Sequence, residues 1–190
     1  NHTLINRSWC IANPLHFDDY GENAWGLTAS DDPFGYSAHA PGNPADNGTI
    51  TPAAGIPSMP YTPEESIALL KNLYRTYGYA LWGQYGFYDA FNPDENWFAD
   101  SYLAIDQGPI INMIENFRSG LLWDLFMANP EIQPALDAIG FVPDPSFTES
   151  PKTTFDWKVY PSVSDGNIFI DLPETTFTKP YRIEFTDVTG

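Results

Sequence analysis

The segment from Tyr20 to Tyr36 concentrates side chains that can do chemistry. It holds the carboxylates Glu22, Asp31 and Asp32 among aromatic rings and three glycines. Two carboxyl groups can act as general acid and general base, and an apolar ring such as Trp25 limits solvent and raises the pKa of a carboxyl group beside it. Glu22 and Asp31 are therefore the candidate catalytic residues, although Glu22 can instead bind a ligand or have a structural role, and Asp31 equally suits a turn or a helix cap. Asp32 stands before a proline and favours a turn.

No regular period runs through residues 20 to 36. The apolar residues Trp25, Leu27, Phe34 and Tyr36 follow neither the helical nor the alternating strand pattern. The sequence therefore predicts a long ordered loop, and such loops usually persist because a ligand uses them. The alternative is a surface loop that is anchored only by its own aromatic side chains.

The net charge narrows the classes of partner. Twenty-five acidic and 8 basic residues give a formal charge of −17, which repels nucleic acid and anionic membrane surfaces. No apolar run approaches the roughly 18 residues of a membrane span. A glycine-rich phosphate loop, a nucleophilic serine elbow and the usual metal-binding spacings are absent from the sequence, so we expect no cofactor and no metal. The single cysteine, Cys10, is expected to be a core thiol.

An acidic chain rich in Asn, Tyr and Trp is compatible with a carbohydrate ligand. Large rings stack on the apolar C–H faces of sugars, while amides and carboxylates meet their hydroxyl groups. Core packing is the alternative for the rings, and capping of a helix that begins nearby is the alternative for Asp106. The predicted substrate-binding residues are Asn23, Trp25, Tyr36, Tyr85, Trp97, Asp106 and Gln107.

Three segments have the periodicity and end signals of helices that could position these residues. The first helix is predicted from Thr62, which begins a capping box, to Gly78. The second is predicted from about 109 to 128 and is apolar almost all round, so we expect it to be buried. The third is predicted from about 131 to 139. Leu4, Ile5 and Trp9 indicate a further helix face. Long connections at 11–61 and 79–107 favour an all-α scaffold whose cleft is formed by its loops.

The composition changes after residue 141. Residues 142–154 have the Pro and Ser content of a linker, and 155–160, 167–172 and 181–187 alternate as strands do. Residues 155–190 are therefore predicted to form a separate small β unit, which is too small to hold a catalytic cleft.

Motifs spread over residues 1–141 resemble the glycoamylase-like family of bacterial glycoside hydrolases. That family includes endo-β-1,2-glucanases and the glycoamylase-like domain of cyclic β-1,2-glucan synthases. The motifs are Ala12-Asn-Pro, Tyr20-Gly-Glu-Asn-Ala-Trp-Gly-Leu-Thr-Ala-Ser-Asp31, Gly35-Tyr36, Gly48-Thr-Ile-Thr-Pro, Ser58-Met-Pro-Tyr-Thr-Pro-Glu64, Leu81-Trp-Gly, Tyr85-Gly-Phe, Asp89-Ala-Phe-Asn92, Leu103-Ala-Ile-Asp-Gln-Gly-Pro109 and Met113-Ile-Glu-Asn.

The resemblance implies an (α/α)6 barrel, of which residues 1–141 would be the C-terminal half, and hydrolysis of a β-glucan, most specifically β-1,2-glucan. It also implies that the N-terminal half of the same protein holds the leading acid and base candidates, so that the general acid can lie outside this chain. The rival hypothesis is a non-catalytic glycan-binding protein of the same fold. A surface protein without a ligand is a third.

The tail carries a second resemblance. Phe155-Asp-Trp-Lys-Val-Tyr-Pro161, Asp165-Gly-Asn-Ile-Phe-Ile-Asp-Leu-Pro173 and Tyr181-Arg-Ile-Glu-Phe-Thr-Asp-Val-Thr-Gly190 are similar to the C-terminal sorting domain of type IX secretion, although Ser162-Val163 replaces the usual Asn-Pro. This resemblance implies a secreted, cell-surface or periplasmic protein of a Bacteroidetes-type bacterium, with the secretion machinery as a partner of residues 155–190.

Overall fold

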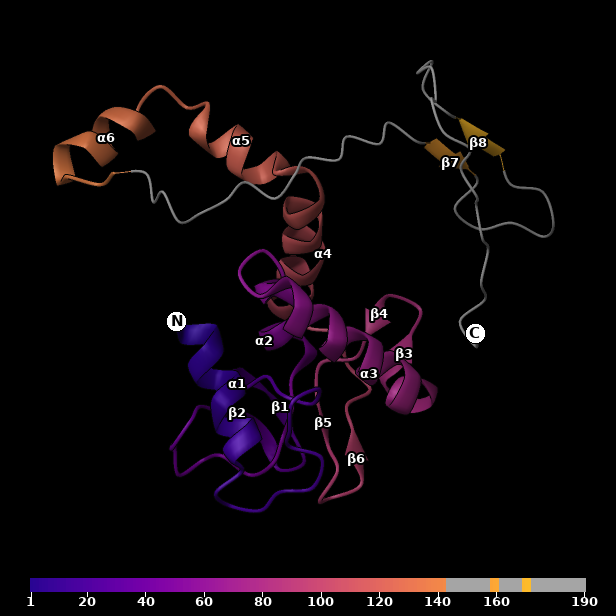
Figure 1. Ribbon diagram of the computed structural model, residues 1–190. Helices are drawn as coiled ribbons and strands as arrows, with labels where there is room; N and C mark the ends of the chain where they lie inside the picture. Colours follow the sequence, from indigo (N-terminus) through magenta and orange to yellow (C-terminus); the bar gives the residue numbers. More distant parts are fainter. Residues whose placement is uncertain (143–157, 161–168, 172–190) are drawn as a thin grey trace. The chain divides into compact units, whose positions relative to one another are not determined.

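The computed structural model describes residues 1–142, 158–160 and 169–171 of the chain. The chain divides into two compact units, Asn1–Ser146 and Phe147–Gly190. Within the described residues the first unit is mostly helical, with six α-helices and three short hairpins (Figure 1). No helix in this described part is long and apolar enough to cross a membrane.

The N-terminal helices include the one with the clearest sequence signals. They are α1 (His2–Ala12), α2 (Pro52–Gly55), the 3-10 turn η1 (Ile56–Ser58) and α3 (Pro63–Leu81). Helix α3 begins where Thr62 and Pro63 predict, but the Thr62 side chain makes no cap hydrogen bond, and its hydroxyl donates to the Ser58 carbonyl at 3.2 Å. The expected end at Gly78 is wrong: the helix continues to Leu81, whose side chain is fully buried.

The predicted helix over 109–128 is in fact two helices. Helix α4 (Ala104–Ser119) begins five residues earlier, and α5 (Leu121–Met127) follows a break at Gly120, which adopts a left-handed φ of 72°. The expected burial is also wrong for the described residues, since Asn116 is the buried residue of α4 and Phe126 is 61% exposed. Helix α6 (Ile132–Ile139) ends at Gly140, as predicted.

Three antiparallel hairpins occupy the segments that were expected to be loops. They pair β1 (Ala29–Asp32) with β2 (Gly35–Ala38), β3 (Trp82–Gly83) with β4 (Gly86–Phe87), and β5 (Phe91–Asn92) with β6 (Trp97–Phe98). The scaffold is thus mostly helical rather than all-α. Residues 20–36 are not aperiodic throughout, because Asp31 and Tyr36 face each other across the first hairpin.

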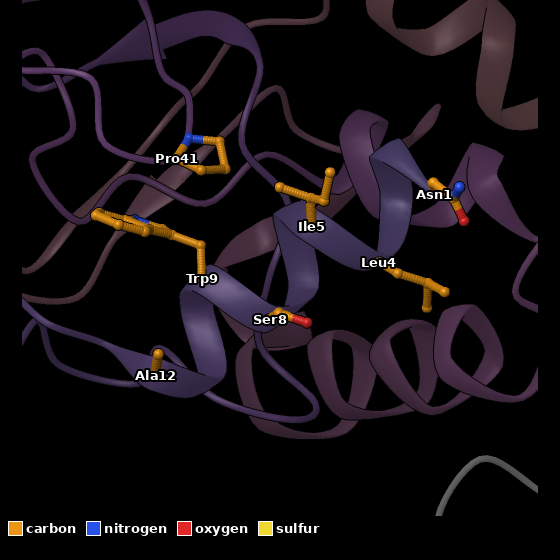
Figure 2. A pocket seen from close by; sticks show the side chains of 7 residues that line it. All are labelled: Asn1, Leu4, Ile5, Ser8, Trp9, Ala12 and Pro41. Atoms are coloured by element: carbon orange, nitrogen blue, oxygen red, sulfur yellow. The ribbon is translucent and has the colours of Figure 1, made fainter.

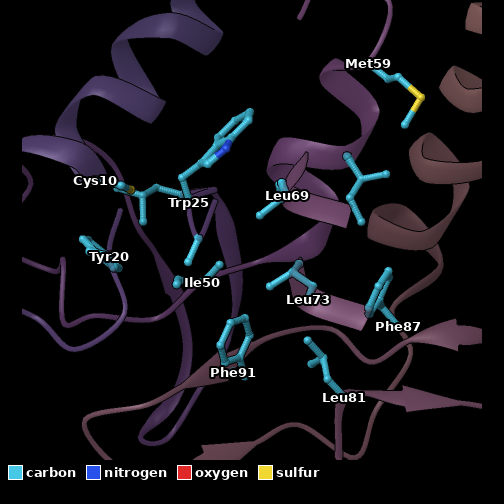
Figure 3. Close-up of a cluster of buried hydrophobic side chains, with 13 residues drawn as sticks. Cys10, Tyr20, Trp25, Ile50, Met59, Leu69, Leu73, Leu81, Phe87 and Phe91 are labelled. Atoms are coloured by element: carbon cyan, nitrogen blue, oxygen red, sulfur yellow. The ribbon is translucent and has the colours of Figure 1, made fainter. Parts of the chain in front are cut away.

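The hydrophobic core lies between α3 and the segments that precede and follow it (Figure 3). Its largest fully buried side chains include Trp25, Ile50, Leu69, Leu73, Leu81 and Phe91. Backbone hydrogen bonds connect these segments: the Thr51 amide donates to the Gly26 carbonyl at 2.9 Å. Gly26 has a φ of 134°, and a Cβ there would lie 2.7 Å from the Thr51 carbonyl oxygen, so this close approach requires glycine.

Cys10 also belongs to this core. Its thiol is fully buried, and burial raises its pKa to about 12. A thiol in that environment remains protonated at neutral pH, which agrees with a packing role.

The second unit is described only at two strands. In it, β7 (Lys158–Tyr160) pairs antiparallel with β8 (Phe169–Asp171), with Val159 opposite Ile170. These strands fall inside the predicted segments 155–160 and 167–172. The third predicted strand, 181–187, and the predicted linker beyond Val142 lie outside the described residues.

Candidate active site

Asp31 lies where three parts of the chain meet. Its backbone amide donates to the Oδ2 of Asp89 at 2.8 Å, and its side-chain Oδ2 accepts a hydrogen bond from the Ser101 hydroxyl at 2.5 Å. Asp89 and Ser101 are brought together because the ladder of β5 and β6 continues beyond both strands, with the Asp89 amide donating to the Ser101 carbonyl at 3.1 Å. The first hairpin is thereby attached to the third hairpin at Asp31.

Asp89 is a fully buried carboxyl group. Burial raises its pKa to about 7, the hydrogen bond from the Asp31 amide opposes this rise, and Asp106, as an acceptor for the protonated form and as a negative charge, adds to it together with the charge of Asp31. Burial disfavours the charged form of a carboxyl group, and a second carboxylate disfavours it further. Asp89 is therefore protonated in a large fraction of molecules at neutral pH.

Asp106 approaches Asp89 from the first turn of α4. The N-cap residue Leu103 makes no side-chain cap hydrogen bond, and Asp106 is the acidic residue of the first turn, a position that also suits the helix-start role that was the alternative for it. Its carboxyl group also lies close enough to that of Asp89 to raise the pKa of Asp89. The next residue, Gln107, donates from Nε2 to the Phe87 carbonyl at 2.8 Å, which attaches the start of α4 to β4.

Two carboxyl oxygens, Asp89 Oδ1 and Asp106 Oδ2, are buried and have no hydrogen-bond partner among the described residues. A buried polar atom without a hydrogen-bond partner lowers the stability of the folded state. One proton shared between these two oxygens would give both of them a partner. Together with Asp31, these residues form what we call the carboxyl cluster: Asp31, Asp89 and Asp106.

Tyr36 lies at the solvent side of this cluster. Its side chain is 59% exposed, and Asp31 is its partner across the β1–β2 hairpin. Desolvation, followed by the charges of Asp106, Asp89 and Asp31, raises the pKa of the Tyr36 hydroxyl. An exposed ring above acidic groups can stack on a sugar face while the carboxyl groups meet sugar hydroxyls.

The other predicted carboxylate, Glu22, is exposed. Its backbone carbonyl accepts a hydrogen bond from Arg7 Nε at 3.2 Å, and Glu22 is not among the groups that act on Asp89 or on Tyr36. Asn23 is also exposed, and its carbonyl accepts from Asn72 Nδ2 at 2.8 Å. Within the described residues, the structure therefore brings Asp31 and Asp106 together but leaves Glu22 apart from them.

The predicted aromatic contacts divide into core and surface. Trp25 is only 1% exposed and lies against Gly55, so in this chain its ring is a core element and offers no face to a sugar. Tyr85 is 69% exposed and packs edge-on against Tyr102 at a centroid distance of 5.4 Å. Trp97 is half-buried in β6.

Asp32 has the turn role that its position before a proline predicts. Its Oδ1 accepts from the Phe34 amide at 2.7 Å, and its Oδ2 lies 3.6 Å from His39 Nε2 and accepts from Asn47 Nδ2 at 3.3 Å. Asp32 thus braces the β1–β2 hairpin. Within the described residues no group of three or more His, Cys, Asp or Glu is arranged to hold a metal ion.

A separate hollow of about 570 Å³ lies along α1 (Figure 2). Figure 2 shows Leu4, Ile5 and Trp9 around it, with Pro41 from the segment after β2. It shares no residue with the carboxyl cluster and contains no acidic group among its lining residues. The chemistry of the described chain is therefore assigned to the cluster and not to this hollow.

Asp89 and Ser101 were missed as site residues in the sequence. Asp89 begins the motif Asp89-Ala-Phe-Asn92, where a single carboxylate precedes the apolar, buried residues Ala90 and Phe91. An acidic residue next to a short buried strand is a usable signal, because burying a carboxyl group costs free energy that a structural role alone rarely returns. Ser101 has no comparable signal, since its place depends on the pairing of two-residue strands.

Comparison with known proteins gives one family. The model of the Glycoamylase family, described as "Putative glucoamylase", matches residues 1–130. A crystal structure of a glucoamylase-like protein from Bacteroides uniformis is 60% identical, with a TM-score of 0.71 over 74% of this chain and 34% of that one. An endo-β-1,2-glucanase from Chitinophaga pinensis, solved with sophorotriose and glucose, is 56% identical, with a TM-score of 0.70 over 72% of this chain and 32% of that one.

A curated relative adds an activity by name. The exo β-1,2-glucooligosaccharide sophorohydrolase of Parabacteroides distasonis, which acts at the non-reducing end, is 46% identical over 135 residues, which is 71% of this chain and 19% of the relative. The chain thus spans about a third of the solved structures it matches and about a fifth of this curated relative.

Proposed function

Because the chain belongs to the Glycoamylase family, we propose that it forms part of a glycoside hydrolase that acts on a β-glucan, most specifically a β-1,2-glucan. Relatives that are 46% and 56% identical are named for β-1,2-linked substrates, and one was solved with sophorotriose. The observation on this chain that carries the proposal is the convergence of Asp31, Asp89 and Asp106 below the exposed ring of Tyr36.

We further propose that residues 1–141 are the C-terminal half of an (α/α)6 barrel. The partial coverage of the matched structures supports this. So do the exposed apolar side chains of α4 to α6, including Ile111, Leu125 and Phe126, which are 68%, 63% and 61% exposed. Contiguous apolar surface of this kind usually packs against another part of a protein. The remaining helices of the barrel would cover it.

The cluster suits one wall of a glucan site. Hydrolysis of a glycosidic bond requires one carboxyl group that protonates the leaving oxygen and a second that activates water or attacks the sugar. In this proposal, Asp31 and Tyr36 contact the sugar next to the reacting bond. The second carboxyl group of the catalytic pair would come from the part of the barrel that this chain does not supply.

The proposal is tested on the full-length protein with linear β-1,2-glucan, by counting the reducing ends released. We expect release from β-1,2-glucan, and a loss of about 10²-fold in kcat/KM for Asp31→Asn, because the amide removes the negative charge that faces the sugar. The matched control is Asp137→Asn, an exposed change of the same kind on α6, which should leave kcat/KM within about twofold.

Two outcomes would contradict this proposal. If the full-length protein releases no reducing sugar but retains affinity for the glucan, it is a non-catalytic glycan-binding protein of the same fold. If it neither binds nor cleaves the glucan, the family resemblance does not extend to the substrate. Export through residues 155–190 is a separate proposal, which is supported by the resemblance of that segment alone.

A further inference from the structure

Asp89 lies beside Asp106, a half-buried residue of α4. Asp89 is fully buried, whereas the exposed group nearest to solvent in this region is Tyr36. A carboxyl group without access to solvent is not placed to take a proton from water or to protonate a sugar oxygen directly. Asp89 therefore acts through its neighbours.

The contacts of Asp89 connect three elements. Its Oδ2 accepts from the Asp31 amide of β1 at 2.8 Å, its own amide donates to the Ser101 carbonyl at 3.1 Å, and its carboxyl group lies close enough to Asp106 of α4 for Asp106 to raise its pKa. The groups that face it are thus Asp31 and Asp106, both acidic, together with the hydroxyl of Tyr36, whose pKa the cluster raises. Two carboxylates in contact inside a protein cannot both be ionised without a large cost.

We propose that Asp89 is a positioning residue that carries a proton at neutral pH and donates it from Oδ1 to Oδ2 of Asp106, and so holds Asp31 in place at the sugar-facing hairpin. The two buried oxygens that have no other donor are the ones that this hydrogen bond satisfies. The remaining oxygen of Asp89 is then free to accept from the Asp31 amide, as observed.

Asparagine can make both hydrogen bonds that a neutral Asp89 makes in this proposal. In Asp89→Asn, the carbonyl oxygen can accept from the Asp31 amide and the NH₂ group can donate to Asp106, whereas leucine at this position can do neither. The activity assay of this proposal rests on the proposed function, because it needs a β-1,2-glucan substrate. A second assay, without substrate, tests the protonation of Asp89 alone.

The substrate-free readout is infrared difference spectroscopy of the full-length protein at pH 6. We expect the C=O band of a buried protonated carboxyl group in the spectrum of the wild type minus that of Asp89→Asn. Absence of this band would overturn the proposal, whether or not the protein cleaves β-1,2-glucan. Its presence in a protein that fails to cleave the glucan would retain the inference and reject the proposed function.

The activity readout compares two variants across a pH series. Asp89→Asn should keep kcat/KM within about threefold of the wild type at pH 6, while Asp89→Leu should lose at least about tenfold, because β1 is no longer attached to Asp106. A folded Asp89→Asn that loses about 10²-fold would mean that an ionised carboxylate is needed here, and a fully active Asp89→Leu would mean that the pair positions nothing. Either result would overturn the proposal.

Discussion

The raised pKa of Asp89 makes the stability of this protein depend on pH in a way that one substitution should remove. The pKa rises from 3.8, its ordinary value, to about 7 in the folded chain. The folded state therefore binds more protons than the unfolded state between these two values. Stability from this group is fully present below pH 3.8 and is lost as the pH rises towards and through about 7.

The size of the effect follows from the two pKa values. Each unit of difference corresponds to about 1.4 kcal/mol, and the slope is close to its maximum across most of the window. Between pH 5 and pH 7, the free energy of unfolding of the wild type should fall by about 1 to 3 kcal/mol relative to that of Asp89→Asn, in which position 89 does not titrate.

Urea denaturation of both proteins at pH 5, 6 and 7 measures this difference. Asp137→Asn is the control, because Asp137 is exposed and its replacement should shift the free energy of unfolding equally at all three pH values. If the difference between the wild type and Asp89→Asn is flat, or grows in favour of the wild type as the pH rises, Asp89 is not protonated in the folded state and the account of the pair is wrong.

Three further predictions concern sugar contact and backbone conformation. Tyr36→Ala should raise KM for β-1,2-glucan by on the order of tenfold with little change in kcat, since it removes a ring face; an unchanged KM would remove Tyr36 from the site. Glu22→Gln should leave kcat and KM within about threefold, because Glu22 is exposed and lies apart from the carboxyl cluster, whereas a loss of about 10²-fold in kcat would identify an acid or base. Gly26→Ala should lower the free energy of unfolding by at least about 2 kcal/mol, because Gly26 has a positive φ. The control, Gly108→Ala, lies in open space within α4 and should raise the free energy of unfolding by about 0.5 to 1 kcal/mol. Equal effects of the two substitutions in urea denaturation would contradict the close approach at Gly26.

The helix starts and ends that depend on local chemistry were predictable from the sequence. Proline after Thr62 fixes the start of α3, and glycine at position 140 ends α6 in the left-handed conformation. The break at Gly120 was not predicted, because the apolar residues on both sides of it continue the helical pattern. Their number predicted burial, but burial depends on what packs against a helix, and that is not encoded in the periodicity of the helix itself.

The candidate site was predictable only in part. Asp31, Tyr36 and Asp106 were identified from residue type and neighbours, and the structure places them in one region. Asp89 was not, because it joins them through strands of two residues, which are too short for an alternating pattern. Trp25 shows the converse: a ring beside a carboxylate is typical of a binding site, yet its burial follows from contacts with α2 and α3 that are distant in the sequence.

The most direct test of the central claim is a crystal structure of the full-length protein with a β-1,2-linked glucooligosaccharide such as sophorotriose. We predict a sugar ring stacked on Tyr36 and a sugar hydroxyl within hydrogen-bonding distance, about 2.5 to 3.2 Å, of the Asp31 carboxylate, with Asp89 still covered. An oligosaccharide bound elsewhere, with Tyr36 and Asp31 facing solvent, would contradict the assignment of the carboxyl cluster to the glucan site.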